Sequence, residues 1–91
     1  MRQASPENYR RELVHNLAEI QTDKNMHRFL DILLTPPEFD ELSRRLQILK
    51  RLIKGKTQRK IAHDLRVGIA TVERGASELR KKPKVKKMIL H

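Results

Sequence analysis

The stretch that decides the fold is QRKIAHDLRVGIATVER, residues 58–74. Apolar residues recur at three- and four-residue steps in residues 58–65 and again from Ile69, which predicts two short helices. Only residues 66–68 separate them, a spacing typical of a helix-turn-helix. In such a hairpin the second helix presents its amino end outward, where it has the size and dipole sense to enter a major groove. The stretch therefore predicts a DNA-binding motif.

The hairpin also predicts its own contacts and its reading face. We expect the first helix to pack against the second through Ile61, Ala62 and Leu65 on one side and Val72, Ala76 and Leu79 on the other. Arg66 occupies a turn position that favours glycine, so we expect a strained, left-handed backbone there. The DNA-facing candidates are Gln58, Arg59 and Lys60 at the first helix start and Ile69, Ala70, Thr71 and Glu73 on the second helix.

The rest of the chain also shows helical periodicity, so the predicted fold class is all-α, with short helices in a single domain, residues 1–91. Ser5 and Asp23 are expected to cap two N-terminal helices, the first over residues 6–21, within residues 1–34. The segment Thr35-Pro36-Pro37-Glu38 predicts the start of a long central helix, residues 36–54, which Gly55 ends. Its expected buried stripe is Leu42, Leu46, Leu49 and Ile53.

The helix-turn-helix then covers residues 58–81, and a short C-terminal helix follows at residues 84–90. The two N-terminal helices carry more apolar surface than a compact monomer of this size covers. We therefore expect residues 1–34 to form the dimerisation helices of an interwoven homodimer.

Charge divides the chain in two. Residues 1–43 carry five Lys or Arg against eight Asp or Glu, a net charge of −3, whereas residues 44–91 carry sixteen against three, a net charge of +13. Such a field favours binding to a polyanion such as nucleic acid and makes that binding salt-sensitive. For the Lys-rich stretch KKPKVKK, residues 81–87, a solvated surface that only aids solubility is the competing interpretation.

Other classes of protein find little support. The chain has no cysteine, and its four histidines have no second ligand at metal spacing, so we expect no metal. No nucleophile-and-base pattern indicates an enzyme. No stretch reaches the roughly 20 apolar residues that span a bilayer, and the first residues lack the apolar run of a secretory signal. We expect a cytoplasmic protein with no membrane contact.

The segment LLTPPEFDELSRRLQILKRLIKGKTQRKIAHDLRVGIATVERGASELRKKP, residues 33–83, resembles the Trp repressor family of bacteria. Its most specific parts are LLTPPE, the basic helix ending in LIKG, TQR, and GIAT followed by RG. The resemblance implies an all-helical dimer that binds a two-fold symmetric duplex DNA operator and represses transcription. It also implies L-tryptophan as corepressor.

The resemblance assigns a ligand site. The indole is expected to lie between Arg45 and Arg74, and its carboxylate to contact Thr35. Backbone carbonyls of Ile32 and Leu34 from the other subunit would take the ammonium, and Gly75 matches the glycine beside the second arginine. An arginine plane can stack on a ring and neutralise a carboxylate, and an adjacent glycine leaves room for a ligand edge.

Two residues depart from the family pattern. Glu78 stands where the family has a serine that assists the ammonium, and it could either hold that ammonium or pair with Arg74 or Lys82 and close the pocket. Glu73 stands where the family has a threonine, and it could accept from a cytosine amino group. Arg45 could also simply pair with Glu41. A ligand-independent DNA-binding relative and a protein- or RNA-interaction module remain the alternative functions.

Overall fold

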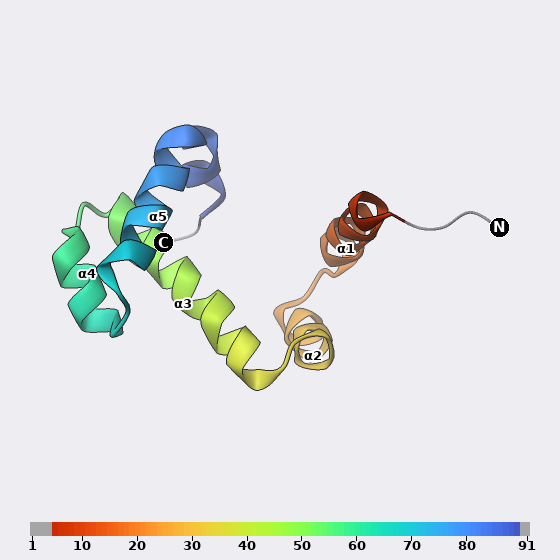
Figure 1. Ribbon diagram of the computed structural model, residues 1–91. Helices are drawn as coiled ribbons and strands as arrows, with labels where there is room; N and C mark the ends of the chain where they lie inside the picture. Colours follow the sequence, from red (N-terminus) through yellow and green to blue (C-terminus); the bar gives the residue numbers. More distant parts are fainter. Residues whose placement is uncertain (1–4, 90–91) are drawn as a thin grey trace. The chain divides into compact units, whose positions relative to one another are not determined.

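The computed structural model describes residues 5–89, and its elements are all helical. They are α1 (Pro6–Glu19), α2 (Asp23–Leu33), α3 (Pro36–Ile53), α4 (Gln58–Leu65), α5 (Ile69–Lys81) and the 3-10 helix η1 (Pro83–Met88), as Figure 1 shows. The predicted all-α class is confirmed, whereas interweaving with a second copy stays a prediction. The chain forms two compact units, Met1–Phe39 and Asp40–His91.

The first two helices begin at side-chain caps. As predicted, the Ser5 hydroxyl accepts a hydrogen bond from the Asn8 amide at 3.2 Å at the start of α1. The prediction for α2 was wrong by one residue, because Thr22 is the cap and its hydroxyl accepts from the Asn25 amide at 3.1 Å. Asp23 is instead the first helical residue, where its negative charge suits the positive end of the helix dipole.

Neither α1 nor α2 contains a buried residue. Large apolar side chains stay exposed on both, and Val14 at 65% and Ile32 at 87% are the most exposed of them. α1 also ends at Glu19, two residues before the predicted end, because Ile20 leaves the helical backbone region. The apolar faces of these two helices are therefore not covered within their own unit, which is the surface that the dimer prediction requires.

A reciprocal capping box starts α3. The Thr35 amide donates to Glu38 Oε1 at 2.9 Å, and the Glu38 amide donates to Thr35 Oγ1 at 3.4 Å. The Thr35 hydroxyl also donates to Glu38 Oε1 at 2.9 Å. These bonds, from the backbone of Thr35 first and from its side chain second, lower the pKa of Glu38. The predicted helix start at residue 36 is confirmed.

The buried stripe of α3 differs from the predicted one. Ile48, which was not predicted, is 2% exposed, whereas Leu42 and Leu46 are 47% and 45% exposed. Leu49 and Ile53 are half-buried. The helix ends at Ile53, one residue before the predicted end, and the φ of 85° at Gly55 lets the Lys56 amide reach back to the Arg51 carbonyl at 3.0 Å. The part of α3 that is buried is therefore the part that contacts the helices after Gly55.

The core of the second unit is built by α3, α4 and α5. Ile48, Ile61 and Val72 form a buried cluster, and Ala62 and Leu65 pack against it. Ala76 and Leu79 of α5 are also buried, at 9% and 6% exposed. The α4 and α5 faces are those that the sequence predicted.

The turn between α4 and α5 is tight. Arg66 ends α4 in the left-handed region, with φ 54° and ψ 47°, which confirms the predicted backbone conformation. The amide of Val67 then donates to the Ala62 carbonyl at 3.0 Å, and half-buried Val67 packs on the core. A Cβ in this region costs roughly 1–2 kcal/mol, and the turn that carries this cost places Val67 against the core.

The C-terminal segment differs from the predicted helix at residues 84–90. η1 begins at Pro83 and ends at Met88, and residue 90 lies outside the described residues. Pro83 prevents α5 from continuing, because proline has no backbone N–H for a helical hydrogen bond. Half-buried Val85 and buried Ile89, at 8% exposed, turn inward, so the lysines between them are held at the surface.

Candidate ligand pocket and nucleic-acid interface

The amino end of α5 is the centre of the candidate nucleic-acid interface. Its N-cap, Gly68, offers no side-chain cap, and the Thr71 amide donates only to the Gly68 carbonyl, at 3.1 Å. The predicted DNA-facing residues of α5 are all exposed: Ile69, Ala70, Thr71 and Glu73. A helix start without a side-chain cap leaves amides that suit an anion such as a phosphate.

The start of α4 supplies the other DNA-facing candidates. Gln58 is half-buried, whereas Arg59 and Lys60 are exposed. Lys60 Nζ lies 3.0 Å from Asp64 Oδ2, and hydrogen bonds from Lys60 first and His63 second lower the pKa of Asp64. Arg59 has no ion pair within residues 5–89, so it is the uncommitted cation at this helix start.

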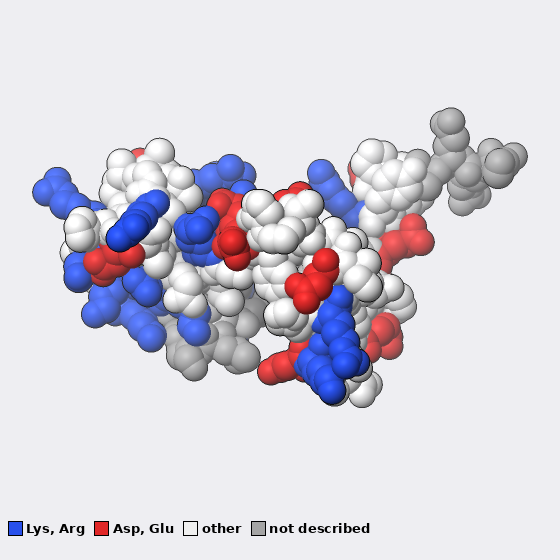
Figure 2. Space-filling view, turned by 90° about the horizontal axis from the view of Figure 1, so that it is seen from below, with Lys and Arg blue, Asp and Glu red and all other residues white. Residues whose placement is uncertain are grey.

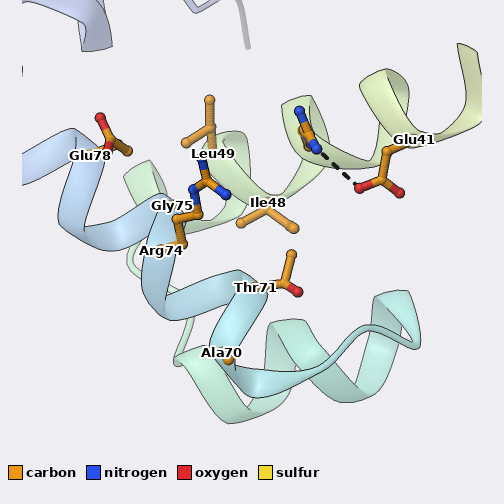
Figure 3. Close-up of a pocket in the computed structure, with 9 residues that line it drawn as sticks. Glu41, Ile48, Leu49, Ala70, Thr71, Arg74, Gly75 and Glu78 are labelled. Carbon is orange, nitrogen blue, oxygen red and sulfur yellow. Dashed lines mark ion pairs between the residues drawn. The ribbon is translucent and has the colours of Figure 1, made fainter. Parts of the chain in front are cut away.

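A pocket of about 420 Å³ lies between α3 and α5, within the second unit (Figure 3). This volume falls in the range of small-molecule sites, roughly 300–1,000 Å³. α3 supplies Glu41, Arg45, Ile48 and Leu49, and α5 supplies Ala70, Thr71, Arg74, Gly75 and Glu78. The pocket thus brings together four of the predicted ligand residues, Arg45, Arg74, Gly75 and Glu78.

The two arginines of the pocket differ in their partners. Arg45 Nε lies 3.4 Å from Glu41 Oε1, so the simple pairing of Arg45 with Glu41 is present in the structure. Arg74 has no ion pair within residues 5–89, and in Figure 3 its side chain extends from α5 toward Leu49. Glu78, the residue one turn further along α5, pairs with Lys82 rather than with Arg74, at 3.8 Å. Arg74 is therefore free to meet an anion.

Gly75 has a packing role that the sequence did not indicate. A Cβ at this position would lie 3.1 Å from Ile48 Cγ2 and 3.6 Å from Leu49 Cδ2. Because these contacts are closer than or equal to ordinary van der Waals distance, the missing side chain lets α5 approach α3. The same glycine also lines the pocket.

The remaining predicted ligand residues, Ile32, Leu34 and Thr35, belong to the first unit and do not line this pocket. Pro36 has no N–H, so the Ile32 carbonyl has no amide partner four residues on. The corresponding partner of Leu34, the Glu38 amide, donates to Thr35 Oγ1 instead. These carbonyls are therefore available as acceptors, whereas the Thr35 hydroxyl must leave Glu38 before it can donate to a ligand carboxylate.

Comparison with known proteins decides the family. A model of the Trp repressor protein family matches residues 9–91 of the chain. The chain belongs to the Trp repressor family. This is a family of transcriptional repressors and not of enzymes.

Curated relatives agree with this assignment. The Trp operon repressor homolog of Vibrio parahaemolyticus serotype O3:K6 is 41% identical over 73 residues, which cover 78% of this chain and 71% of the relative. The homolog of Vibrio campbellii is 43% identical over 68 residues, 72% and 68% of the two chains. That of Vibrio atlanticus is 33% identical over 89 residues, 96% and 91% of the two chains. No solved structure matches the chain significantly.

The Trp repressor resemblance did not by itself indicate every residue of the pocket. Glu41, Ile48 and Leu49 were not predicted as ligand residues, and Ala70 and Thr71 were assigned only to DNA. Helical spacing carries the missing signal, because 41, 45, 48 and 49 fall on one face of α3, and 70, 71, 74, 75 and 78 on one face of α5. Spacing identifies each face separately, but it does not show that the two helices pack with these faces toward one pocket.

Two further observations bear on the predicted absences. Within residues 5–89, no helix is both long and apolar enough to cross a membrane. In the same part of the chain, no three His, Asp or Glu side chains are grouped as metal ligands would be.

Proposed function

We propose that this member of the Trp repressor family represses transcription as a homodimer that reads duplex DNA and takes L-tryptophan as corepressor. The start of α5 would enter the major groove of a two-fold symmetric operator, and the start of α4 would contact its phosphates. Tryptophan would lie in the pocket between α3 and α5, with Arg74 meeting its carboxylate and the Ile32 and Leu34 carbonyls of the partner subunit taking its ammonium.

One observation carries the link between ligand and DNA. Ala70 and Thr71 line the pocket and also form the first turn of α5. A ligand in the pocket therefore contacts, from behind, the turn that faces the groove. If the ligand binds more tightly when this turn is placed as DNA requires, the ligand raises the affinity for DNA. DNA then raises the affinity for the ligand by the same factor.

The charge of the second unit supports duplex DNA as the partner. In the view of Figure 2, Lys and Arg side chains gather at the left, over the second unit. Because residues 44–91 have a net charge of +13, the phosphate backbone would be bound in a strongly salt-dependent way.

A ligand-independent DNA-binding relative is the second candidate, and one observation favours it. Arg45 is already paired with Glu41, and Glu78 with Lys82, so two of the pocket's charges have partners without a ligand. Both pairs are exposed, and exposed pairs of this kind are weak. A ligand that offers better partners would displace them, which is why we favour the corepressor function.

The experiment is a gel shift on duplexes selected from a random pool, with and without L-tryptophan. We expect tryptophan to raise affinity for the selected duplexes, and Arg74→Ala to abolish this increase while leaving salt-sensitive binding to any duplex. Arg80→Ala, at an exposed position of α5 outside the pocket, is the control and should keep the increase. Shifts that tryptophan does not change would establish the ligand-independent relative, and preference for single-stranded RNA would refute the DNA proposal.

A further inference from the structure

Six basic residues lie within residues 80–87, where α5 ends and η1 follows it. The sequence has no Asp or Glu after Glu78, which pairs with Lys82 at 3.8 Å. The other five cations are exposed and have no ion pair in the described part of the chain, and they are Arg80, Lys81, Lys84, Lys86 and Lys87. This end of the second unit therefore carries positive charge that the unit itself does not neutralise.

Local structure accounts for only two of these five cations. Arg80 and Lys81 lie in the last turn of α5, where the negative end of the helix dipole favours basic side chains. The lysines of η1 lie beyond that turn, outside the range over which the dipole acts. A 3-10 helix has three residues per turn, so Lys84 and Lys87 lie one above the other, about 6 Å apart along the axis. Like charges this close repel each other, and a bound polyanion would remove the repulsion.

η1 is fixed to the second unit and is not a free tail. Pro83 restricts the backbone at its start, and the Val85 amide donates to the Lys82 carbonyl at 3.1 Å. The Ile89 amide donates to the Lys86 carbonyl at 3.3 Å at its end. Val85 is half-buried and Ile89 is buried, so both ends of the segment are anchored. Its lysines are thus held in place before a partner arrives, which lowers the entropy lost on binding.

The lysines of η1 lie far from the helix start that faces DNA in the proposed function. α5 has 13 residues, so its two ends are about 20 Å apart at 1.5 Å per residue. In Figure 1, α4 lies beside the start of α5, and η1 lies beside its other end. At physiological ionic strength, salt screens exposed charges that are more than about 8 Å apart. These lysines therefore add little to binding of the duplex that the start of α5 contacts.

We propose that Lys84, Lys86 and Lys87 bind the phosphate backbone of a second stretch of duplex DNA, so that the protein holds two stretches at once. The inference goes beyond the proposed function and needs from it only that the start of α5 binds a duplex. The second stretch belongs to a separate duplex or, where the DNA is long, to a distant part of the same molecule. Because phosphate contacts carry no sequence information, this stretch can have any sequence.

The composition of the second unit favours a duplex over a single strand as this partner. Proteins that bind single-stranded nucleic acid stack its bases on aromatic side chains. The sequence has no Phe, Tyr or Trp after Phe39, so residues 40–91 offer no such platform. A lysine ammonium is a compact point charge, which suits a phosphate. A duplex keeps its bases stacked on each other and presents its phosphates outward, so it needs no aromatic partner.

A bridging assay with the full chain tests this inference. A short duplex that carries the selected operator is fixed to beads and saturated with protein, unbound protein is washed away, and a fluorescent duplex of unrelated sequence is added. We expect the parent to retain the fluorescent duplex. The slope of log K against log salt is about −0.9 for each phosphate contact, so three contacts predict about forty-fold weaker retention at 200 mM than at 50 mM salt.

Two triple variants with equal loss of charge separate the η1 lysines from general basicity. The η1 triple variant should bind the operator duplex as the parent does but lose the fluorescent duplex, and its substitutions are Lys84→Gln, Lys86→Gln and Lys87→Gln. The control variant should keep both duplexes. It removes three exposed cations of α1 and α2 that have no ion pair within residues 5–89, through Arg11→Gln, Lys24→Gln and Arg28→Gln. Circular dichroism checks that both variants keep their helices.

The outcomes separate this inference from the proposed function. If the operator duplex holds the parent but no fluorescent duplex is retained, the inference is wrong and the proposed function stands. The same holds if the η1 triple variant retains as much fluorescent duplex as the parent. If single-stranded RNA displaces the fluorescent duplex more strongly than unlabelled duplex at equal phosphate concentration, duplex DNA is the wrong partner. If the operator duplex does not hold the parent, both the DNA proposal and this inference fail.

Discussion

At the scale of the residue, Arg66 has a side chain that strains its own backbone conformation. Its φ of 54° lies in the region that glycine adopts freely and that a Cβ disfavours. The sequence alone predicted this position, because the turn of a helix-turn-helix requires a left-handed residue where this chain has arginine. The side chain is exposed, so burial does not explain its presence.

Replacing Arg66 with glycine should therefore stabilise the chain. We expect Arg66→Gly to raise the free energy of unfolding by about 1 kcal/mol, since the steric cost of the left-handed conformation disappears. Urea denaturation measures the change. Arg66→Ala is the matched control, because it removes the charge but keeps the Cβ, and it should give no comparable gain. Equal effects of the two substitutions would show that charge, and not backbone strain, is responsible.

Pocket residues were partly predictable at this scale. Arg45, Arg74, Gly75 and Glu78 were named from the sequence by family resemblance, and the structure brings them to one pocket. The contacts that they make were left open, because Glu78 has two basic residues at helical distance, Arg74 and Lys82. Only side-chain geometry decides between them. The same holds for Gly75, whose close approach to Ile48 depends on a helix crossing that no local pattern contains.

At the scale of the element, helix starts were readable because their signals are local. Ser5 caps α1 and Thr35 caps α3, each by accepting a hydrogen bond from the amide three residues later. A short window of sequence therefore contains both the cap residue and its hydrogen-bond partner. The start of α2 has two adjacent residues able to cap, Thr22 and Asp23, and sequence gives no reason to choose the first. The predicted buried stripe of α3 was wrong for a different reason, because the burial of Ile48 depends on contacts with α4 and α5.

The capping box of α3 makes the chain sensitive to acid. The pKa of Glu38 lies below its usual value because the Thr35 amide and hydroxyl stabilise its carboxylate. A lowered folded-state pKa contributes stability above the unfolded-state pKa, about 4.3, and this contribution is lost as pH falls through the folded value. We expect the parent to melt higher than Glu38→Gln at neutral pH and the difference to shrink below about pH 4.3.

Thermal melting of both chains between neutral pH and strong acid measures this difference. Glutamine keeps the hydrogen bonds of a capping box and removes only the titrating charge, so it isolates the effect of ionisation. A difference between the two melting temperatures that stays constant across the acid range would contradict the role assigned to the Glu38 carboxylate.

At the scale of the whole molecule, charge is distributed unevenly. η1 carries Lys84, Lys86 and Lys87 at the surface, and none of them has an ion pair within residues 5–89. The sequence left open whether this stretch binds a polyanion or only aids solubility. The structure adds that Val85 and Ile89 fix the segment against the second unit, so its cations are held in place rather than on a free tail.

Replacing these three lysines should change how DNA binding responds to salt. If they bind phosphates, the triple variant Lys84→Gln, Lys86→Gln, Lys87→Gln should lower the slope of log K against log salt by about 0.9 for each phosphate that is no longer neutralised, without changing the preferred duplex. Filter binding at several salt concentrations measures the slope. Lys24→Gln on α2, in the acidic part of the chain, is the control. An unchanged slope in the triple variant would support the solubility interpretation.

Ala70 and Thr71 line the pocket, and under the proposed function they also face the DNA groove, which has a genetic consequence. A substitution at either position alters two recognition events through the same atoms, so a selection for a new operator preference will also return variants with a shifted response to the ligand. The choice of target sequence and the choice of effector are thereby tied together in inheritance, and neither can drift far while the other is held constant.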